Sequence, residues 1–187
     1  PFTLNFANAY LIVTHKSLSS SAQTYLNYRL SAAGGAKNAL LFDIDELNLQ
    51  FGGGVPKHVM GLRRFQDFAF NQSLTNPPGH IFLVGKGIRE ATEGSASGGG
   101  MRTTPSAYAQ CLIPSFGFPA SDVLISAGLN GTTLAPLIPV GRLAATNNAE
   151  VITYLNKVKE FELAQDPNSI YSIPNKLWQK EILHFGG

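Results

Sequence analysis

The feature that most constrains the fold is an alternation of short, largely apolar runs with helix-like stretches over the first 85 residues. The runs at 9–14, 39–42 and 80–84 are typical of strands buried on both faces of a parallel sheet. The stretches between them carry apolar residues at the spacing of an amphipathic helix. These residues are Leu18, Ala22, Tyr25, Leu26 and Leu30 in the first stretch, and Val59, Leu62, Phe65, Phe68 and Ala69 in the second. The pattern predicts an α/β fold, a Rossmann-like, mostly parallel sheet with helices on both faces and right-handed crossovers.

Polar and glycine signals set the expected limits of these elements. Ser17 or Ser19 is expected to cap the first helix, and Gly34-Gly35 to end it, because glycine accepts the left-handed backbone of a helix C-cap. The second strand is expected to finish at residues 43–45. A loop at Gly52-Gly53-Gly54 then leads to Pro56, which is predicted to be the first residue of the second helix.

The second half of the chain is less regular. Residues 108–113 and 122–126 predict short strands, and Asn130-Gly131 predicts a hairpin turn. Residues 137–142 predict a further strand, which Pro139 places at a sheet edge or a strand end. We expect Thr146 to cap a last helix that ends before Pro167. The residues predicted to face inward from it are Val151, Leu155, Val158 and Phe161.

The same signals divide the chain into parts. Residues 1–165 are predicted to form one α/β subdomain, 166–177 a linker, and 178–187 the first strand of a truncated next subdomain. The glycine- and serine-rich stretch 91–104 is expected to be a mobile loop.

Composition excludes several classes of function. Hydrophobic residues make up 44% of the chain, which is enough for a packed core and excludes a disordered protein. A net charge of +2, with scattered lysines and arginines, gives no basic strip for nucleic acid. No apolar run approaches the about 20 residues that cross a bilayer. Only 14% of the residues are charged, which favours a surface that rests on other protein.

Polar residues follow the predicted strands, where ligands bind in doubly wound sheets. Two interpretations stay open, a polar binding crevice or the caps of the following helices and turns. The crevice residues are His15, Lys16, Gly85, Lys86, Gly87, Asp122, Gly141 and Arg142.

Three carboxylates after the second strand, those of Asp43, Asp45 and Glu46, could bind calcium, which prefers clustered oxygen ligands. The alternative is that they cap the next helix. The four histidines have no zinc-ligand spacing, and residues 85–90 lack the third glycine of a dinucleotide fingerprint. No cofactor is therefore predicted with certainty, and calcium is the one candidate.

Cys111, the single cysteine, excludes an internal disulfide. Its neighbours Gln110, Leu112 and Ile113 form a largely apolar segment without a glycine-flanked exposed turn. The sequence therefore predicts a buried structural thiol and not a nucleophile.

Several segments, in this order and spacing, resemble the gingipain-like cysteine peptidases, which include the sortase-type peptidases of the type IX secretion system. The segments are residues 9–16, 41–47, 51–54, 62–65, 81–87, 105–114, 121–122 and 140–143, followed by Trp178. The family's catalytic domain is similar to caspases and has two α/β subdomains. This chain resembles the first subdomain, which in the family is a structural support for the second, catalytic subdomain. The sequence departs from the family in Lys86, where an aspartate is usual, and in Val123, which replaces the second of two aspartates.

The resemblance implies a non-catalytic subdomain of a secreted or cell-surface bacterial endopeptidase, with a link to type IX secretion. The histidine and cysteine of the family lie downstream of the matching region, and His184 is not expected to be the catalytic histidine. The implied partners are the downstream catalytic subdomain and a polypeptide substrate. Two alternatives stay open. One is a non-catalytic interaction module on a bacterial surface or secretion apparatus, and the other is a flavodoxin-like domain that binds a small molecule.

Overall fold

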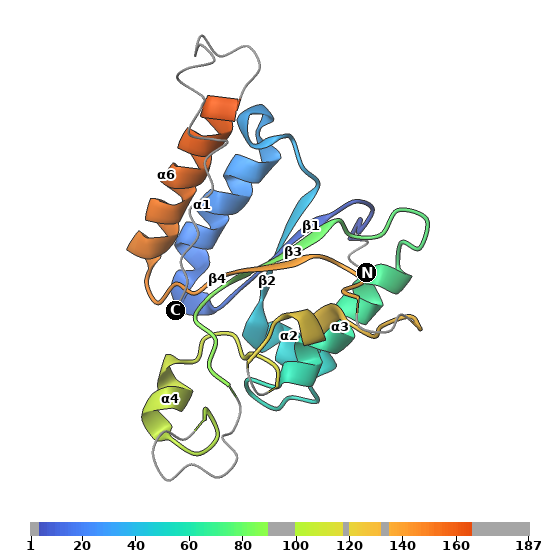
Figure 1. The fold of residues 1–187 in the computed structure, drawn as a ribbon, viewed down its shortest axis with the longest axis vertical. Helices are drawn as coiled ribbons and strands as arrows, with labels where there is room; N and C mark the ends of the chain where they lie inside the picture. The colour runs from blue at the N-terminus through green and yellow to red at the C-terminus, as the bar shows by residue number, and fades with distance from the viewer. Residues whose placement is uncertain (1–3, 90–99, 118–119, 132–134, 166–187) are drawn as a thin grey trace, which may run out of the picture.

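The computed structural model describes residues 4–89, 100–117, 120–131 and 135–165. Their centre is a parallel sheet of four strands in the order β2-β1-β3-β4 (Figure 1). The strands are β1 (Tyr10–Thr14), β2 (Ala39–Asp43), β3 (His80–Val84) and β4 (Val140–Leu143). All three pairings are parallel, which confirms the predicted sheet.

Helices cover both faces of this sheet, as expected (Figure 1). On one face α1 (Ser19–Leu30) packs against α6 (Asn148–Gln165), and on the other α2 (Ile44–Phe51) packs against α3 (Val59–Asn71). The short α5 (Val123–Ser126) lies against α3, whereas α4 (Pro105–Gln110) lies apart from both helical layers. Two 3-10 turns, η1 (Lys16–Leu18) and η2 (Ala32–Gly34), flank α1.

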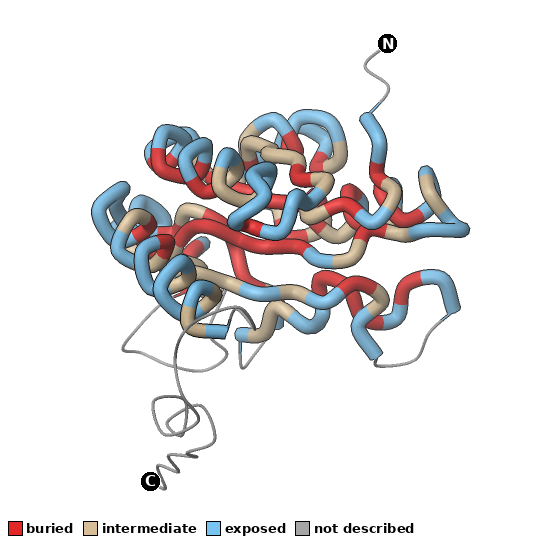
Figure 2. The backbone as a smooth tube through the Cα atoms, turned by 90° about the horizontal axis from the view of Figure 1, so that it is seen from above, coloured by how far each residue is buried: buried red, intermediate tan, exposed pale blue. Residues whose placement is uncertain are grey.

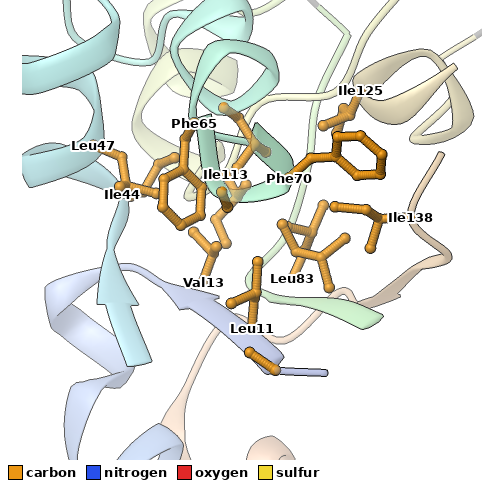
Figure 3. Close-up of a cluster of buried hydrophobic side chains, with 14 of the residues drawn as sticks. Leu11, Val13, Ile44, Leu47, Phe65, Phe70, Leu83, Ile113, Ile125 and Ile138 are labelled. Carbon is orange, nitrogen blue, oxygen red and sulfur yellow. The ribbon is translucent and has the colours of Figure 1, made fainter. Parts of the chain in front are cut away.

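The core consists of two apolar layers, one on each face of the sheet. Leu11 and Val13 of β1 point to the layer that α2 and α3 cover, and Ile12 points to the layer under α1 and α6. Figure 3 shows Leu11, Val13 and Leu83 directed toward Phe65 and Phe70 of α3. Figure 2 shows the buried residues concentrated in the central strands, with the exposed ones on the outer sides of the helices. Strands buried on both faces explain why the runs lack a polar alternation.

Two predicted strands are wrong. Residues 105–110 form the helix α4, with Pro105 at its first turn, and Val123–Ser126 forms the helix α5. Both predictions used runs of five or six residues, in which periodicity does not separate a strand from a single helical turn or two. Asn130 and Gly131 do form a turn with positive φ, but the described residues on either side of it make one antiparallel bridge, between Ala127 and Pro136, and no hairpin strands.

Several helix predictions need correction. The first helix, α1, has Leu18 at its N-cap position and no capping side chain, and it ends at Leu30, whereas Gly35 ends the following turn η2. The chain forms α2 directly after β2, where no helix was predicted, and α3 begins at Val59, not at Pro56. The backbone of Lys57 has φ 55°, which is incompatible with a right-handed helix. The N-cap of α3 is therefore His58, whose ring nitrogen Nδ1 accepts a hydrogen bond from the Met60 N–H. At α6 the cap is Asn147, one residue later than predicted, and Phe161 is 46% exposed instead of inward.

The last strand prediction shifts by a few residues. β4 spans Val140–Leu143, and within the described ranges it pairs with β3 alone, which makes it the edge strand of this sheet, as Pro139 predicts. The predicted linker 166–177 and strand 178–187 lie outside the described residues, as does most of the loop 91–104. No helix in the described ranges is long and apolar enough to span a membrane.

Candidate functional site

The carboxyl ends of β1 and β3 are neighbours at the centre of the sheet. Thr14, the last residue of β1, lies between Asp43 of β2 and Val84 of β3 in the strand register. β2 lies on one side of β1 and β3 lies on the other, so the order in which the chain adds strands reverses between β1 and β3. Ligands of doubly wound folds bind at such a switch point, which makes this edge the place to examine the predicted residues.

After β1, His15 and Lys16 gather around one carboxylate. Asp45 Oδ2 lies 3.4 Å from Lys16 Nζ and 3.8 Å from His15 Nε2. The other ring nitrogen, His15 Nδ1, accepts a hydrogen bond of 3.2 Å from the Ser17 N–H and so caps η1. His15 therefore has a structural role at one nitrogen and faces Asp45 with the other.

The three carboxylates proposed for calcium point to different places. Asp43 Oδ1 accepts from the backbone N–H groups of Asp45, at 2.7 Å, and Glu46, at 3.3 Å, which makes it the N-cap of α2. Asp45 turns to His15 and Lys16, and Glu46 is exposed on α2. Among the residues that the structure describes, no three histidine, cysteine, aspartate or glutamate side chains are grouped to hold a metal ion. Calcium binding stays a prediction without structural support.

Arg142 is the best-connected side chain at this edge. It forms a bidentate pair with Asp122, with Nε 2.7 Å from Oδ2 and Nη2 2.8 Å from Oδ1. Its Nη1 donates at 2.9 Å to the carbonyls of Gly85 and Ile113, and Nη2 donates to Pro114 O at 3.3 Å. The side chain is 12% exposed. With its donors used, Arg142 fixes the loop after β3 and has little left for a ligand.

The other crevice residues also have structural roles. Lys86 donates from its ammonium to Gln110 Oε1 at 2.9 Å. A Cβ on Gly87 would lie 2.9 Å from Arg142 Nη1 and would clash with Ser115 Oγ, so a larger residue there would require these two side chains to move. Gly141 pairs with Phe82 inside β4 and is not at a strand end. The predicted crevice thus separates into one group around Asp45 and another around Arg142.

A hollow of about 370 Å³ lies beside the group around Asp45. Its wall includes three residues that sequence reasoning did not select, namely Asn48 of α2, Lys57 of the loop before α3, and Tyr108 of α4. Lys57 donates to Tyr108 O, and its Nζ lies 4.1 Å from the centre of the Tyr108 ring. Burial lowers the pKa of the Lys57 ammonium below its ordinary value. Sequence alone gave no signal for Lys57, because it lay within the predicted helix.

Cys111 has none of the features of a nucleophile. The residue is fully buried, and its Sγ lies 3.9 Å from the carbonyl of Ile88. Burial raises the pKa of the thiol, the opposite of what a reactive thiolate needs. No histidine in the described ranges is hydrogen-bonded to it. The predicted burial of Cys111 is confirmed.

The strand order and the polar loops at the carboxyl ends of β1 and β3 define a doubly wound α/β domain with the caspase-like arrangement that was predicted. The model of Peptidase family C25 matches residues 4–187, and the chain belongs to this family. This confirms the resemblance to gingipain-like cysteine peptidases.

Among solved structures, dimeric latent PorU from Porphyromonas gingivalis is similar in fold, with a TM-score of 0.62 at 14% sequence identity. The match covers 94% of this chain and 18% of the PorU chain, so the present chain spans less than a fifth of that protein. A comparison with curated proteins found no match.

Proposed function

We propose that the chain is a non-catalytic, supporting subdomain of a secreted or cell-surface cysteine endopeptidase, with a role linked to type IX secretion. In such an enzyme a thiolate attacks the scissile carbonyl while an imidazole acts as general base. Both groups would belong to a downstream catalytic subdomain of the same polypeptide, and the substrate would be another polypeptide. Membership of Peptidase family C25 supports the class of enzyme, and the likeness to PorU in fold supports the link to secretion.

The observation that carries the non-catalytic role is the state of Cys111. A thiol that is fully buried, whose pKa is raised by burial and that has no histidine partner among the described residues lacks the features of a nucleophile, which supports the proposal. The residues at the strand ends lead to the same proposal. Arg142, Asp122 and Asp43 are engaged in fixing loops and capping helices.

The edge of the sheet at β2 is the surface we assign to the downstream subdomain. A mainly apolar hollow of about 510 Å³ lies between β2, α2 and α3, and its wall includes Phe42, Phe51 and Phe65. Phe68 and Leu4 line it as well and are 41% and 45% exposed. An edge strand next to exposed apolar side chains is a surface that proteins usually cover.

The test compares two proteins, the 187-residue chain and the complete gene product, in a fluorogenic peptide-cleavage assay with and without a thiol reductant. We expect no cleavage by the chain alone and thiol-dependent cleavage by the complete product. Cys111→Ala in the complete product should leave that activity unchanged. Cleavage by the chain alone, or its loss from the complete product with Cys111→Ala while the thermal unfolding midpoint is unchanged, would contradict the proposal.

One observation favours the flavodoxin-like alternative, because the order β2-β1-β3-β4 is also that of flavodoxin-like sheets. A ligand that binds only the native state raises the melting temperature. A clear rise in the melting temperature of the chain with flavin mononucleotide would promote this alternative. An unchanged melting temperature would remove it.

A further inference from the structure

Lys57 is held in place before any ligand arrives. Its backbone has φ 55°, an uncommon conformation for a residue with a side chain. Arg102 Nη2 donates to the carbonyl of Lys57 at 3.0 Å, and the ammonium lies against the ring and the carbonyl of Tyr108. Backbone strain of this kind persists only where surrounding contacts impose it, and it is concentrated at binding sites.

The hollow beside Lys57 has an excess of positive charge. Lys57 and Lys16 face it with two ammonium groups, whereas Asp45 supplies one carboxylate, which lies 3.4 Å from Lys16 Nζ. No carboxylate among the described residues lies within ion-pair distance of Lys57, and burial lowers the pKa of its ammonium. A partly desolvated cation without a counter-charge is a site for an anion.

The size and the charge of the hollow indicate a carboxylate in preference to a phosphate. One excess positive charge matches one carboxylate, whereas phosphate sites normally use several backbone N–H groups or an arginine fork. The volume of about 370 Å³ suits a small organic acid or one residue of a peptide, and Leu49 and Pro56 add apolar wall for a short carbon chain.

We propose that this hollow binds a carboxylate, with Lys57 as the ion-pair partner. The carboxylate belongs either to a free organic acid or to an acidic side chain of a peptide. The site is separate from the proposed peptidase chemistry and does not require it.

The experiment titrates the ¹⁵N-labelled 187-residue chain at constant ionic strength and follows its amide resonances. One arm uses succinate, the second uses a glutamate tripeptide blocked at both ends, and the third uses inorganic phosphate. We expect saturable shifts around Asn48 and Lys57 with a carboxylate probe. Saturation by succinate alone identifies a free acid, and saturation by the peptide identifies an acidic side chain.

Three lysine variants test the assignment. Lys57→Gln should weaken carboxylate binding about tenfold, the effect of losing one charge-assisted hydrogen bond. Lys37→Gln removes the same charge from an exposed residue near the opposite end of β2 and should leave the affinity unchanged. Lys57→Arg, which restores the charge, should recover part of the binding, and dispersed spectra of all three variants show that they fold.

Three results would overturn the proposal. The first is that neither carboxylate saturates the shifts at about 0.1 M, a hundred times the millimolar Kd of a weak ligand. The second is equal carboxylate affinity in Lys57→Gln and in the unmodified chain. The third is tighter binding of phosphate than of either carboxylate. None of these outcomes depends on peptidase activity, so failure here and failure of the proposed function are distinguishable.

Discussion

Arg142 offers the sharpest test of how the loops at the strand ends are held. Arg142→Met keeps most of the length and apolar surface of the side chain but removes five hydrogen bonds, two of them to Asp122. Breaking a buried ion pair at one partner costs about 3–5 kcal/mol. The carboxylate of Asp122 is 22% exposed and keeps some water, which places the expected loss near the lower end, at about 3 kcal/mol.

The assay is equilibrium unfolding in urea, followed by far-ultraviolet circular dichroism. In a thermal scan followed by the same signal, a loss of about 3 kcal/mol in a domain of this size lowers the melting temperature by about 6–12 °C. Arg64→Met is the matched control, because Arg64 is exposed and donates a hydrogen bond of 3.1 Å to the carbonyl of Phe51. That variant should change the free energy of unfolding by less than about 0.5 kcal/mol. If the two variants differ by less than about 1 kcal/mol, the stabilising role given to Arg142 is refuted.

Three further predictions follow from other buried or charged groups. Gln66 is fully buried, and its amide has no hydrogen-bond partner among the described residues. Gln66→Met should therefore raise the free energy of unfolding by about 1–3 kcal/mol, whereas Gln50→Met, at an exposed position, should not. Urea unfolding of the two variants measures both changes. The hydrogen bond from the backbone N–H of Thr146 lowers the pKa of the Glu150 carboxyl in the folded chain. The stability that this carboxylate contributes is therefore present above its unfolded pKa and disappears as the pH falls through the lowered folded pKa. Glu150→Gln should flatten the acid side of the plot of unfolding free energy against pH, and an unchanged plot would count against this. Cys111 should react with a disulfide reagent at pH 8 far more slowly in the native chain than in urea, and comparable rates would show that the thiol is accessible.

The first half of the fold follows from the sequence because its signals are long and repeated. The runs at β1 and β2 are each followed by a stretch with helical spacing, and a third run follows at β3, a series that allows few topologies. The second half could not be read in this way. Its elements α4 and α5 have six and four residues, too few for periodicity to identify them.

The sequence identifies the strand-end residues by their position along the chain, but it does not reveal their roles. Sequence position places Asp43 and Arg142 at the correct edge, yet whether a carboxylate caps a helix or binds an ion depends on which backbone N–H groups face it. The pair of Arg142 with Asp122 joins residues 20 positions apart through a folded loop, and no local pattern predicts such a contact. Asn48 and Lys57 line one hollow for the same reason, through the packing of α2, α4 and the loop before α3.

The position of α6 limits how this sheet can be extended. The helix α6 packs beside α1, which connects β1 to β2. Crossovers between parallel strands are almost always right-handed, and on this face of the sheet that handedness moves the chain in the direction from β1 to β2. Any strand that follows α6 and joins the same sheet in this way would lie beyond β2 and not beyond β4. The handedness of protein backbones thus favours growth at the edge where Phe42 borders the apolar hollow over growth beside β4.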